Sequence, residues 1–112
     1  MIKAYKYYYN EKEKLVELLE FLVKDQCDFS NEPETNFAEG VNAHNINHEN
    51  ALLACHKFND DIARGKLMIQ KCKDCGIYFL ITKDEKEWFE SRNLFVPKRC
   101  CKCRIKRKYK EN

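Results

Sequence analysis

The sequence predicts an α+β protein in which a small helical N-terminal unit with a short strand, residues 1–65, precedes a zinc ribbon, residues 66–112. Three observations lead to this prediction. Two Cys-x-x-Cys pairs lie in the last third of the chain, apolar residues recur at helical spacing in the first two thirds, and short apolar runs flank the first pair. We expect the ribbon to be a β-hairpin and a helix held by four cysteines around one zinc ion.

A strand and a helix are predicted at the start of the chain. Alternating tyrosines over residues 2–9 indicate a short strand with one tyrosine face. Residues 11–24, EKEKLVELLEFLVK, carry leucines at spacings of three, one and three, which is typical of an amphipathic helix. We expect another element to cover the apolar side of this helix.

A long loop and a second helix complete the predicted N-terminal unit. Residues 28–50 are rich in Asn, Glu and small residues and contain a proline and a glycine, so neither periodicity is sustained. A structureless loop of this length is uncommon unless it is functional or contains a short helix. A helix is predicted from residues 48–49 to Arg64, with Asn47 as its N-cap and Gly65 just after its end.

The first cysteine pair, Cys72 and Cys75, is expected at the turn of a β-hairpin. Residues 66–71, KLMIQK, lead into the pair as a strand, and residues 77–81, IYFLI, leave it as another. Gly76 follows the pair directly, where a zinc turn often needs a backbone angle that glycine adopts easily.

A helix is predicted between the two cysteine pairs. Thr82 and Glu85 match a capping box, so the helix should begin near residue 83. We expect Trp88 and Phe89 to pack onto the hairpin and Asn93 to end the helix in the left-handed conformation.

Four cysteines have the spacing of a structural zinc site. A tetrahedral zinc ion takes four soft ligands, and a Cys-x-x-Cys turn presents two thiolates from one tight loop. Cys100 and Cys103 supply the second pair; Cys101 with Cys103 is the alternative, although one intervening residue does not match such a turn. Four thiolates leave no open position for a substrate, so we expect no catalysis at the metal and no enzyme activity.

The remaining cysteines and the histidines carry weaker signals. The chain has seven cysteines, no apolar stretch of signal-peptide length at its start and no run as long as a membrane span, so we expect a cytoplasmic protein with reduced thiols. Cys27 and Cys55 occupy apolar positions and are expected in the core rather than as nucleophiles. His44 and His48 suit a second metal only if their segment is helical; the Asn-rich flanks favour exposed loop histidines.

The region around the two cysteine pairs resembles a known family. Residues 72–104, CKDCGIYFLITKDEKEWFESRNLFVPKRCCKCR, look like the probable zinc-ribbon domain of short bacterial and phage proteins, with the pattern CxDCG…PxRCxxCR. The resemblance covers about residues 66–104 and departs at residues 91–93, where the family tends to carry a lysine and a glycine. It implies zinc binding and gives no biochemical activity. The matching positions include Asp74, Gly76, Phe79, Thr82, Glu85, Trp88, Phe89, Pro97, Arg99 and Arg104.

The charge of the chain is concentrated at its C-terminus. The net charge of +3 combines an acidic body, residues 1–97, with a basic tail, residues 98–112. Cations in such a tail can neutralise phosphates and release counterions. Those nearest the cysteines can instead stabilise the formal −2 charge of zinc bound by four thiolates. The eight basic residues of the tail are Lys98, Arg99, Lys102, Arg104, Lys106, Arg107, Lys108 and Lys110.

The sequence therefore predicts a non-catalytic zinc-binding module that contacts nucleic acid or a nucleoprotein machine through its basic tail. The alternative is a protein-interaction module or inhibitor of phage or mobile-element origin. Such a protein would bind a host protein, for example a nuclease of a defence system, through its acidic N-terminal unit and tyrosine strand. A tail that only solubilises the protein is the third interpretation.

Overall fold

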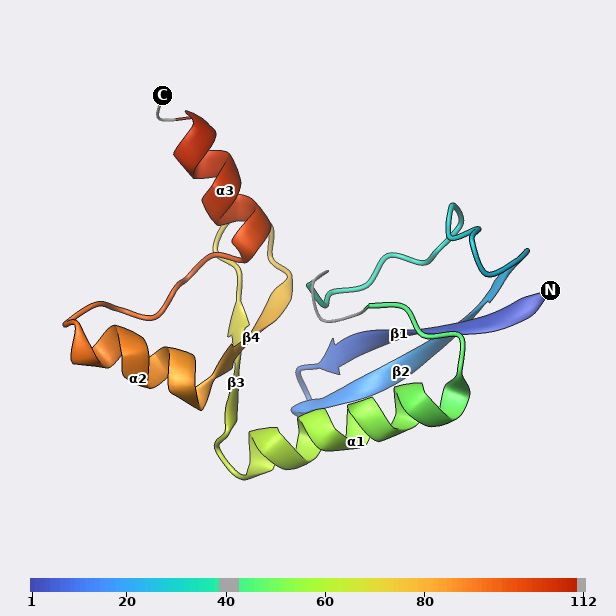
Figure 1. Cartoon of the computed structure of the whole chain (residues 1–112), viewed down its shortest axis with the longest axis horizontal. Helices are drawn as coiled ribbons and strands as arrows, with labels where there is room; N and C mark the ends of the chain where they lie inside the picture. Colours follow the sequence, from blue (N-terminus) through green and yellow to red (C-terminus); the bar gives the residue numbers. More distant parts are fainter. Residues whose placement is uncertain (39–42, 111–112) are drawn as a thin grey trace.

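The chain folds into two antiparallel hairpins and three helices within residues 1–38 and 43–110, which are the residues that this computed structural model describes. The hairpins are separate two-stranded sheets, and α1 connects them along the chain (Figure 1). This arrangement confirms the predicted α+β class. In order, the elements are β1 (Ile2–Asn10), β2 (Leu15–Val23), α1 (His48–Ala63), β3 (Leu67–Lys71), β4 (Tyr78–Thr82), α2 (Lys83–Ser91) and α3 (Cys101–Lys110).

The helix predicted over residues 11–24 is wrong, because residues 15–23 form strand β2. This strand pairs with β1 in a continuous antiparallel register. Leu18 packs toward α1, whereas the ring of Phe21 on the opposite face lies 6.4 Å from that of Phe29 in the following loop. Apolar side chains lie on both faces of this strand, and Leu19 and Leu22 among them are exposed, so the strand lacks the alternation of a half-buried sheet and its leucines imitate helical spacing.

A tight turn replaces the first turn of the predicted helix. The Asn10 side-chain oxygen accepts hydrogen bonds from the backbone amides of Lys12 and Glu13, each at 3.1 Å. Lys14 then adopts a φ of 54°, a left-handed conformation that ends the turn. Side-chain hydrogen bonding by Asn10 therefore reverses the chain before the leucines begin.

Two asparagine side chains close free edges of the first hairpin. Asn59 of α1 accepts a hydrogen bond from the Val16 amide at 2.7 Å and donates one to the Val16 carbonyl at 2.9 Å. Asn36 does the same for Tyr9 on the outer edge of β1, at 2.9 and 2.8 Å. A primary amide offers one acceptor and two donors, so it replaces the hydrogen bonds of a neighbouring strand at that position.

The main core joins the two hairpins across α1. Tyr7 and Tyr9 are buried; the Tyr7 ring meets that of Phe58 at 5.2 Å, and the Tyr9 ring meets that of Tyr78 on β4 at 4.8 Å. The tyrosine face of β1 therefore exists as predicted but is part of the core. Since the apolar cluster spans both predicted units, the boundary after Gly65 stays a prediction.

The segment between β2 and α1 covers the other side of the first hairpin and returns toward the second (Figure 1). Lys6 is buried beneath it, with its ammonium 3.5 Å from Glu32. The amide of Ala38 donates to the Tyr78 carbonyl at 2.8 Å, which fastens the segment to β4. The described part of this segment is a loop, as predicted. Residues 39–42 lie outside the described part of the chain.

The predicted second helix is confirmed as α1. The Asn47 side chain accepts hydrogen bonds from the amides of Glu49 and Asn50, which makes it the N-cap. Gly65, just beyond the C-cap, has a φ of 75°, as expected for a glycine that ends a helix.

The predicted capping box is confirmed at the start of α2. The Thr82 hydroxyl accepts a hydrogen bond from the Glu85 amide at 3.1 Å, and Asn93 has the left-handed φ of 55° expected after the helix. The prediction that Trp88 packs onto the hairpin is wrong. Phe89 takes the half-buried position, and Trp88 is exposed with its ring 5.0 Å from that of Phe89.

Predictions for the cysteines and histidines of the N-terminal unit have mixed outcomes. Cys55 is buried in the core as predicted, but Cys27 is exposed in the turn that follows β2, so the prediction of a core position for Cys27 is wrong. His44 contacts Glu32, and His48 is the first residue of α1, so the two histidines do not share a helix.

Within the described residues, no helix is long and apolar enough to cross a bilayer.

Replacing Asn59 by alanine should destabilise the protein by about 1–3 kcal/mol, because the Val16 amide loses its partner and the Val16 carbonyl keeps only the Cys55 thiol. Urea unfolding followed by circular dichroism measures this change. Lys57→Ala, on the exposed side of the same helix, is the control and should stay close to wild type. Equal stability of the two variants would contradict the edge-closing role of Asn59.

Candidate metal centre

The first cysteine pair lies in the tight turn between β3 and β4. The Cys72 amide donates to the Ile77 carbonyl at 2.7 Å, and the Gly76 amide donates to the Cys72 carbonyl at 3.0 Å. Gly76 has a φ of 78°, which a residue with a Cβ atom adopts only with strain. The turn therefore presents Cys72 and Cys75 from one closed loop, as predicted from their spacing.

The second pair lies at the start of α3. Cys100 immediately precedes the helix and Cys103 is in its first turn, where residues three apart share a face. The Arg104 amide donates to the Cys100 carbonyl at 3.0 Å. The Lys73 amide donates to the Lys98 carbonyl at 2.8 Å, which joins the connection before α3 directly to the first turn.

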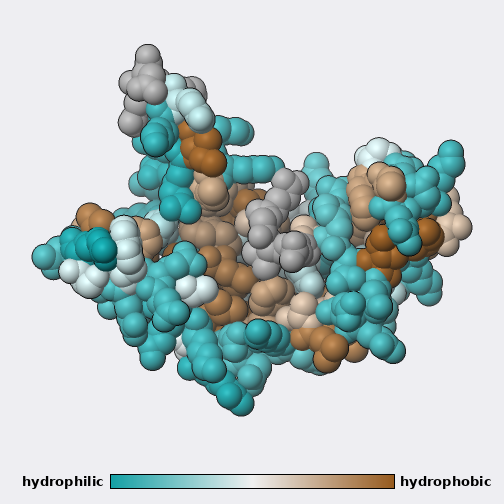
Figure 2. All heavy atoms as spheres, in the orientation of Figure 1, coloured by the Kyte–Doolittle hydropathy of each residue, from teal (hydrophilic) through white to brown (hydrophobic). Residues whose placement is uncertain are grey.

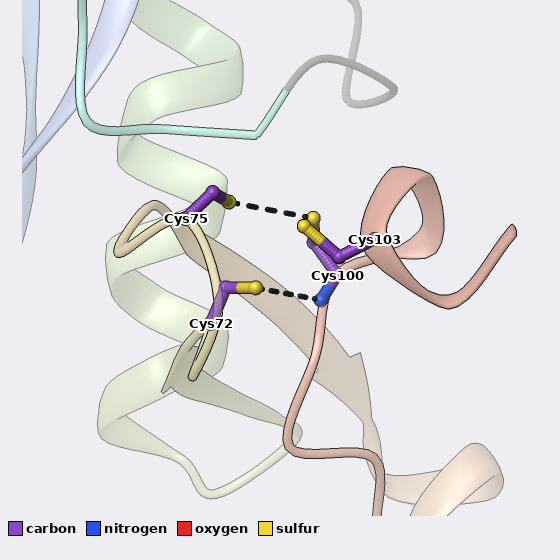
Figure 3. A group of neighbouring side chains, drawn as sticks. All are labelled: Cys72, Cys75, Cys100 and Cys103. Atoms are coloured by element: carbon purple, nitrogen blue, oxygen red, sulfur yellow. Dashed lines mark hydrogen bonds between the residues drawn. The ribbon is translucent and has the colours of Figure 1, made fainter. Parts of the chain in front are cut away.

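The four thiols face one another across the space between these two elements (Figure 3). All four sulfurs lie within 4.8 Å of one another, and those of Cys75 and Cys100 are 3.7 Å apart. Zinc–sulfur bonds of about 2.3 Å in a tetrahedron place the sulfurs about 3.8 Å apart. The group therefore fits a single zinc ion once the longest sulfur–sulfur distances shorten by up to about 1 Å.

The burial of the cysteines distinguishes between the two possible second pairs. Cys100 and Cys103 are buried, and both take part in the four-sulfur group, whereas Cys101 is exposed and lies outside that group. The alternative pairing of Cys101 with Cys103 is therefore wrong. No second group of this kind occurs among the described residues, so neither His44 nor His48 belongs to one.

The pKa values of the clustered thiols show that all four would ionise together only beside a cation. Burial opposes ionisation of Cys72, but hydrogen bonds from backbone amides, including that of Cys100 at 3.3 Å, lower its pKa to about 6. Burial and the neighbouring sulfurs raise the pKa of Cys103 to about 12, and burial is also the main cause that raises the pKa of Cys75. A divalent cation at the centre stabilises every thiolate that contacts it, so it lowers the pKa of the thiols whose ionisation burial opposes.

An ion pair that the sequence did not reveal braces the two halves of the site. The Arg99 Nε lies 3.0 Å from Asp74 Oδ2, and Arg107 Nη1 of α3 lies 3.8 Å from the same oxygen. Asp74 lies within the first turn, whereas both arginines belong to the second half of the site. The one sequence feature that could have indicated this ion pair is that Asp74 and Arg99 are fixed positions of the CxDCG and PxRCxxCR patterns.

The remaining predicted basic residues lie on or just before α3. Lys98 is exposed in the preceding connection, and α3 contains six basic and no acidic residues. Lys110 ends the helix, and its side chain lies outside the described part of the structure. The exposed basic residues of α3 are Lys102, Arg104, Lys106, Arg107 and Lys108.

This geometry defines a zinc-binding treble clef region at the C-terminus, in which a cysteine turn in a hairpin faces a second pair at the start of a helix. Residues 68–112 match the model of a family described as a probable treble clef domain, which covers less than half of the chain. The predicted resemblance to a small zinc-binding domain is thereby confirmed. No curated protein and no solved structure matches the chain.

Purified protein should contain about one zinc ion per chain, and Cys103→Ser should lose it, because removal of one thiolate opens the metal shell. Elemental analysis and thermal unfolding measure the effect. Cys101→Ser removes a thiol of the same helix that lies outside the group, so it should keep the metal and the unfolding temperature. Equal zinc contents in the two variants would overturn the ligand assignment.

Zinc binding should release protons at pH 7, because the raised pKa values keep Cys75 and Cys103 protonated without metal, whereas Cys72 is already mostly ionised. The affinity should therefore fall as the pH is lowered from about 8 to about 6. Calorimetry in buffers of different ionisation enthalpy measures the protons released. A binding enthalpy that does not depend on the buffer would show that the thiols are ionised beforehand.

Proposed function

We propose that this protein is a non-catalytic zinc module that contacts nucleic acid, free or within a nucleoprotein complex, through α3. The observation that carries the proposal is the charge of this helix, which holds six basic and no acidic residues. It projects from the second hairpin with mostly hydrophilic atoms on its surface (Figure 2). A cationic rod of this kind neutralises phosphates at close range.

The zinc site supports the proposal because it sets the direction of the helix. Cys100 and Cys103 hold only the start of α3, and every described side chain from Arg104 to Tyr109 is exposed. Arg104, Lys106 and Lys108 form no ion pair with the described residues. These three cations are therefore available to an external polyanion, whereas Arg99 and Arg107 are drawn toward Asp74.

The closed sulfur shell supports a structural rather than a catalytic role for the metal. Catalytic zinc keeps one position for water or substrate, and four thiolates fill all four. The seven cysteines form no disulfide within the described residues, which accords with the reducing environment of the cytoplasm as the proposed location.

A protein-interaction module or inhibitor of phage or mobile-element origin is the alternative proposal, and the structure removes one of its supports. The strand face that carries Tyr5, Tyr7 and Tyr9 is buried, so it does not offer a contact face, and Tyr8 is the exposed tyrosine of this strand. The acidic charge of the N-terminal unit remains as the support for this alternative, and a protein with an acidic surface is a separate candidate partner for the basic helix. Nucleic acid is the stronger proposal, since the cations are closely spaced along one helix and phosphates are regularly spaced along a strand.

A labelled oligonucleotide should bind at low salt, and its affinity should fall steeply between about 50 and 200 mM salt. The double variant Lys106→Ala/Lys108→Ala should flatten the slope of log affinity against log salt by about 1.5, because two phosphate contacts are lost. Fluorescence anisotropy measures both quantities.

The matched control is Lys12→Ala/Lys57→Ala, which removes the same charge from exposed sites in the N-terminal unit. It should leave the slope close to wild type. Absence of binding at low salt, or an equal loss in both double variants, would overturn the role of α3.

A further inference from the structure

Large apolar side chains are exposed where α2 meets the connection to α3. The exposed fractions are 89% for Phe95, 50% for Leu94 and 48% for Trp88. Apolar atoms are visible at this tip of the molecule, at the left of Figure 2. We call Trp88, Arg92, Leu94 and Phe95 the aromatic corner. Exposure of almost an entire phenylalanine ring is unfavourable in water, so large exposed apolar side chains gathered within eight residues of the chain indicate a contact surface.

A cation accompanies the exposed rings. The Arg92 guanidinium carbon lies 4.1 Å from the centroid of the Trp88 ring, within the range of a cation–π contact. Lys98 is exposed three residues beyond Phe95. Aromatic rings interspersed with cations suit a ligand that has flat faces and negative charge.

The backbone on both sides of Phe95 is fastened. The Leu94 amide donates to the Phe89 carbonyl at 2.9 Å, and the Asn93 amide donates to the Glu90 carbonyl at 3.1 Å. On the other side, the Lys98 carbonyl accepts the Lys73 amide. The Phe95 ring is therefore presented from an anchored connection, so less conformational freedom is lost when a ligand contacts it.

We propose that the aromatic corner stacks on unpaired bases, so that the preferred ligand of this protein is single-stranded nucleic acid. This inference rests on the proposed function, in which α3 binds the phosphates. The corner and α3 belong to the same zinc module and are joined by one short connection (Figure 1). One strand can thus place its phosphates along the helix and a base against Phe95 or Trp88.

Duplex nucleic acid fits the corner less well. Its bases are already stacked on one another, so an aromatic ring reaches them only after a step is opened, which is unfavourable. A single strand exposes base faces without that step, and stacking on an aromatic ring is tolerant of sequence. The cations of α3 attract both single strands and duplexes, so the aromatic corner is the feature that gives single strands the higher affinity.

The test compares Phe95→Ala with wild type on a single-stranded DNA, a single-stranded RNA and the corresponding duplex at one salt concentration. The variant should bind both single strands about tenfold more weakly and the duplex unchanged. Trp88 is the only tryptophan of the chain, so its fluorescence should be quenched by single strands and not by the duplex. Metal content should stay the same, because the removed ring is exposed.

Leu53→Ala is the matched control, because it removes an apolar side chain that is 67% exposed on α1. It should bind as wild type does. Unchanged single-strand affinity in Phe95→Ala, or an equal loss for duplex and single strands, would overturn stacking at the corner while the phosphate-binding role of α3 stands. If wild type binds neither form, or if polyglutamate competes as strongly as a single strand, the proposed function itself is overturned.

Discussion

The enclosure of one cation by four thiols is the interaction on which the C-terminal region depends. Cys72 and Cys75 are fixed by the turn between β3 and β4, and Cys100 and Cys103 are fixed by the start of α3. Without a cation, burial opposes ionisation of Cys75 and Cys103, and the neighbouring sulfurs add to this effect at Cys103, so that both pKa values are raised. With one, the same proximity becomes favourable, so a single ion holds the helix on a hairpin too small to build its own core.

The rest of the chain supports this region from the other side. The ring of Tyr9 on β1 packs against that of Tyr78 on β4, and the loop before α1 adds a backbone hydrogen bond from Ala38 to the same residue. The first hairpin has only two strands, a size that is marginal alone. Its stability depends on α1 over one face, the loop over the other, and asparagine side chains at its edges.

The zinc module has two sets of surface residues, those that brace the metal site and those that are exposed without contributing to it. Asp74 attracts Arg99 and Arg107 and so uses part of the positive charge to brace the two ligand pairs. The cations further along α3 and the exposed rings of Trp88 and Phe95 make no comparable contribution to the described core. A rigid module with cations on one element and exposed rings on the adjoining connection is suited to a charged ligand with flat groups.

The sequence by itself determined the local features: the cysteine spacing gave the metal ligands, Asn47 and Thr82 marked helix starts, and Gly65 and Asn93 marked ends. Each depends on residues a few positions apart. Only the tertiary structure decided that residues 15–23 form a strand, that the tyrosines of β1 are buried, that Trp88 is exposed, and that Asp74 pairs with Arg99. These depend on which distant segment covers a given face, and a run with apolar residues on both faces of a strand has no periodicity that distinguishes strand from helix.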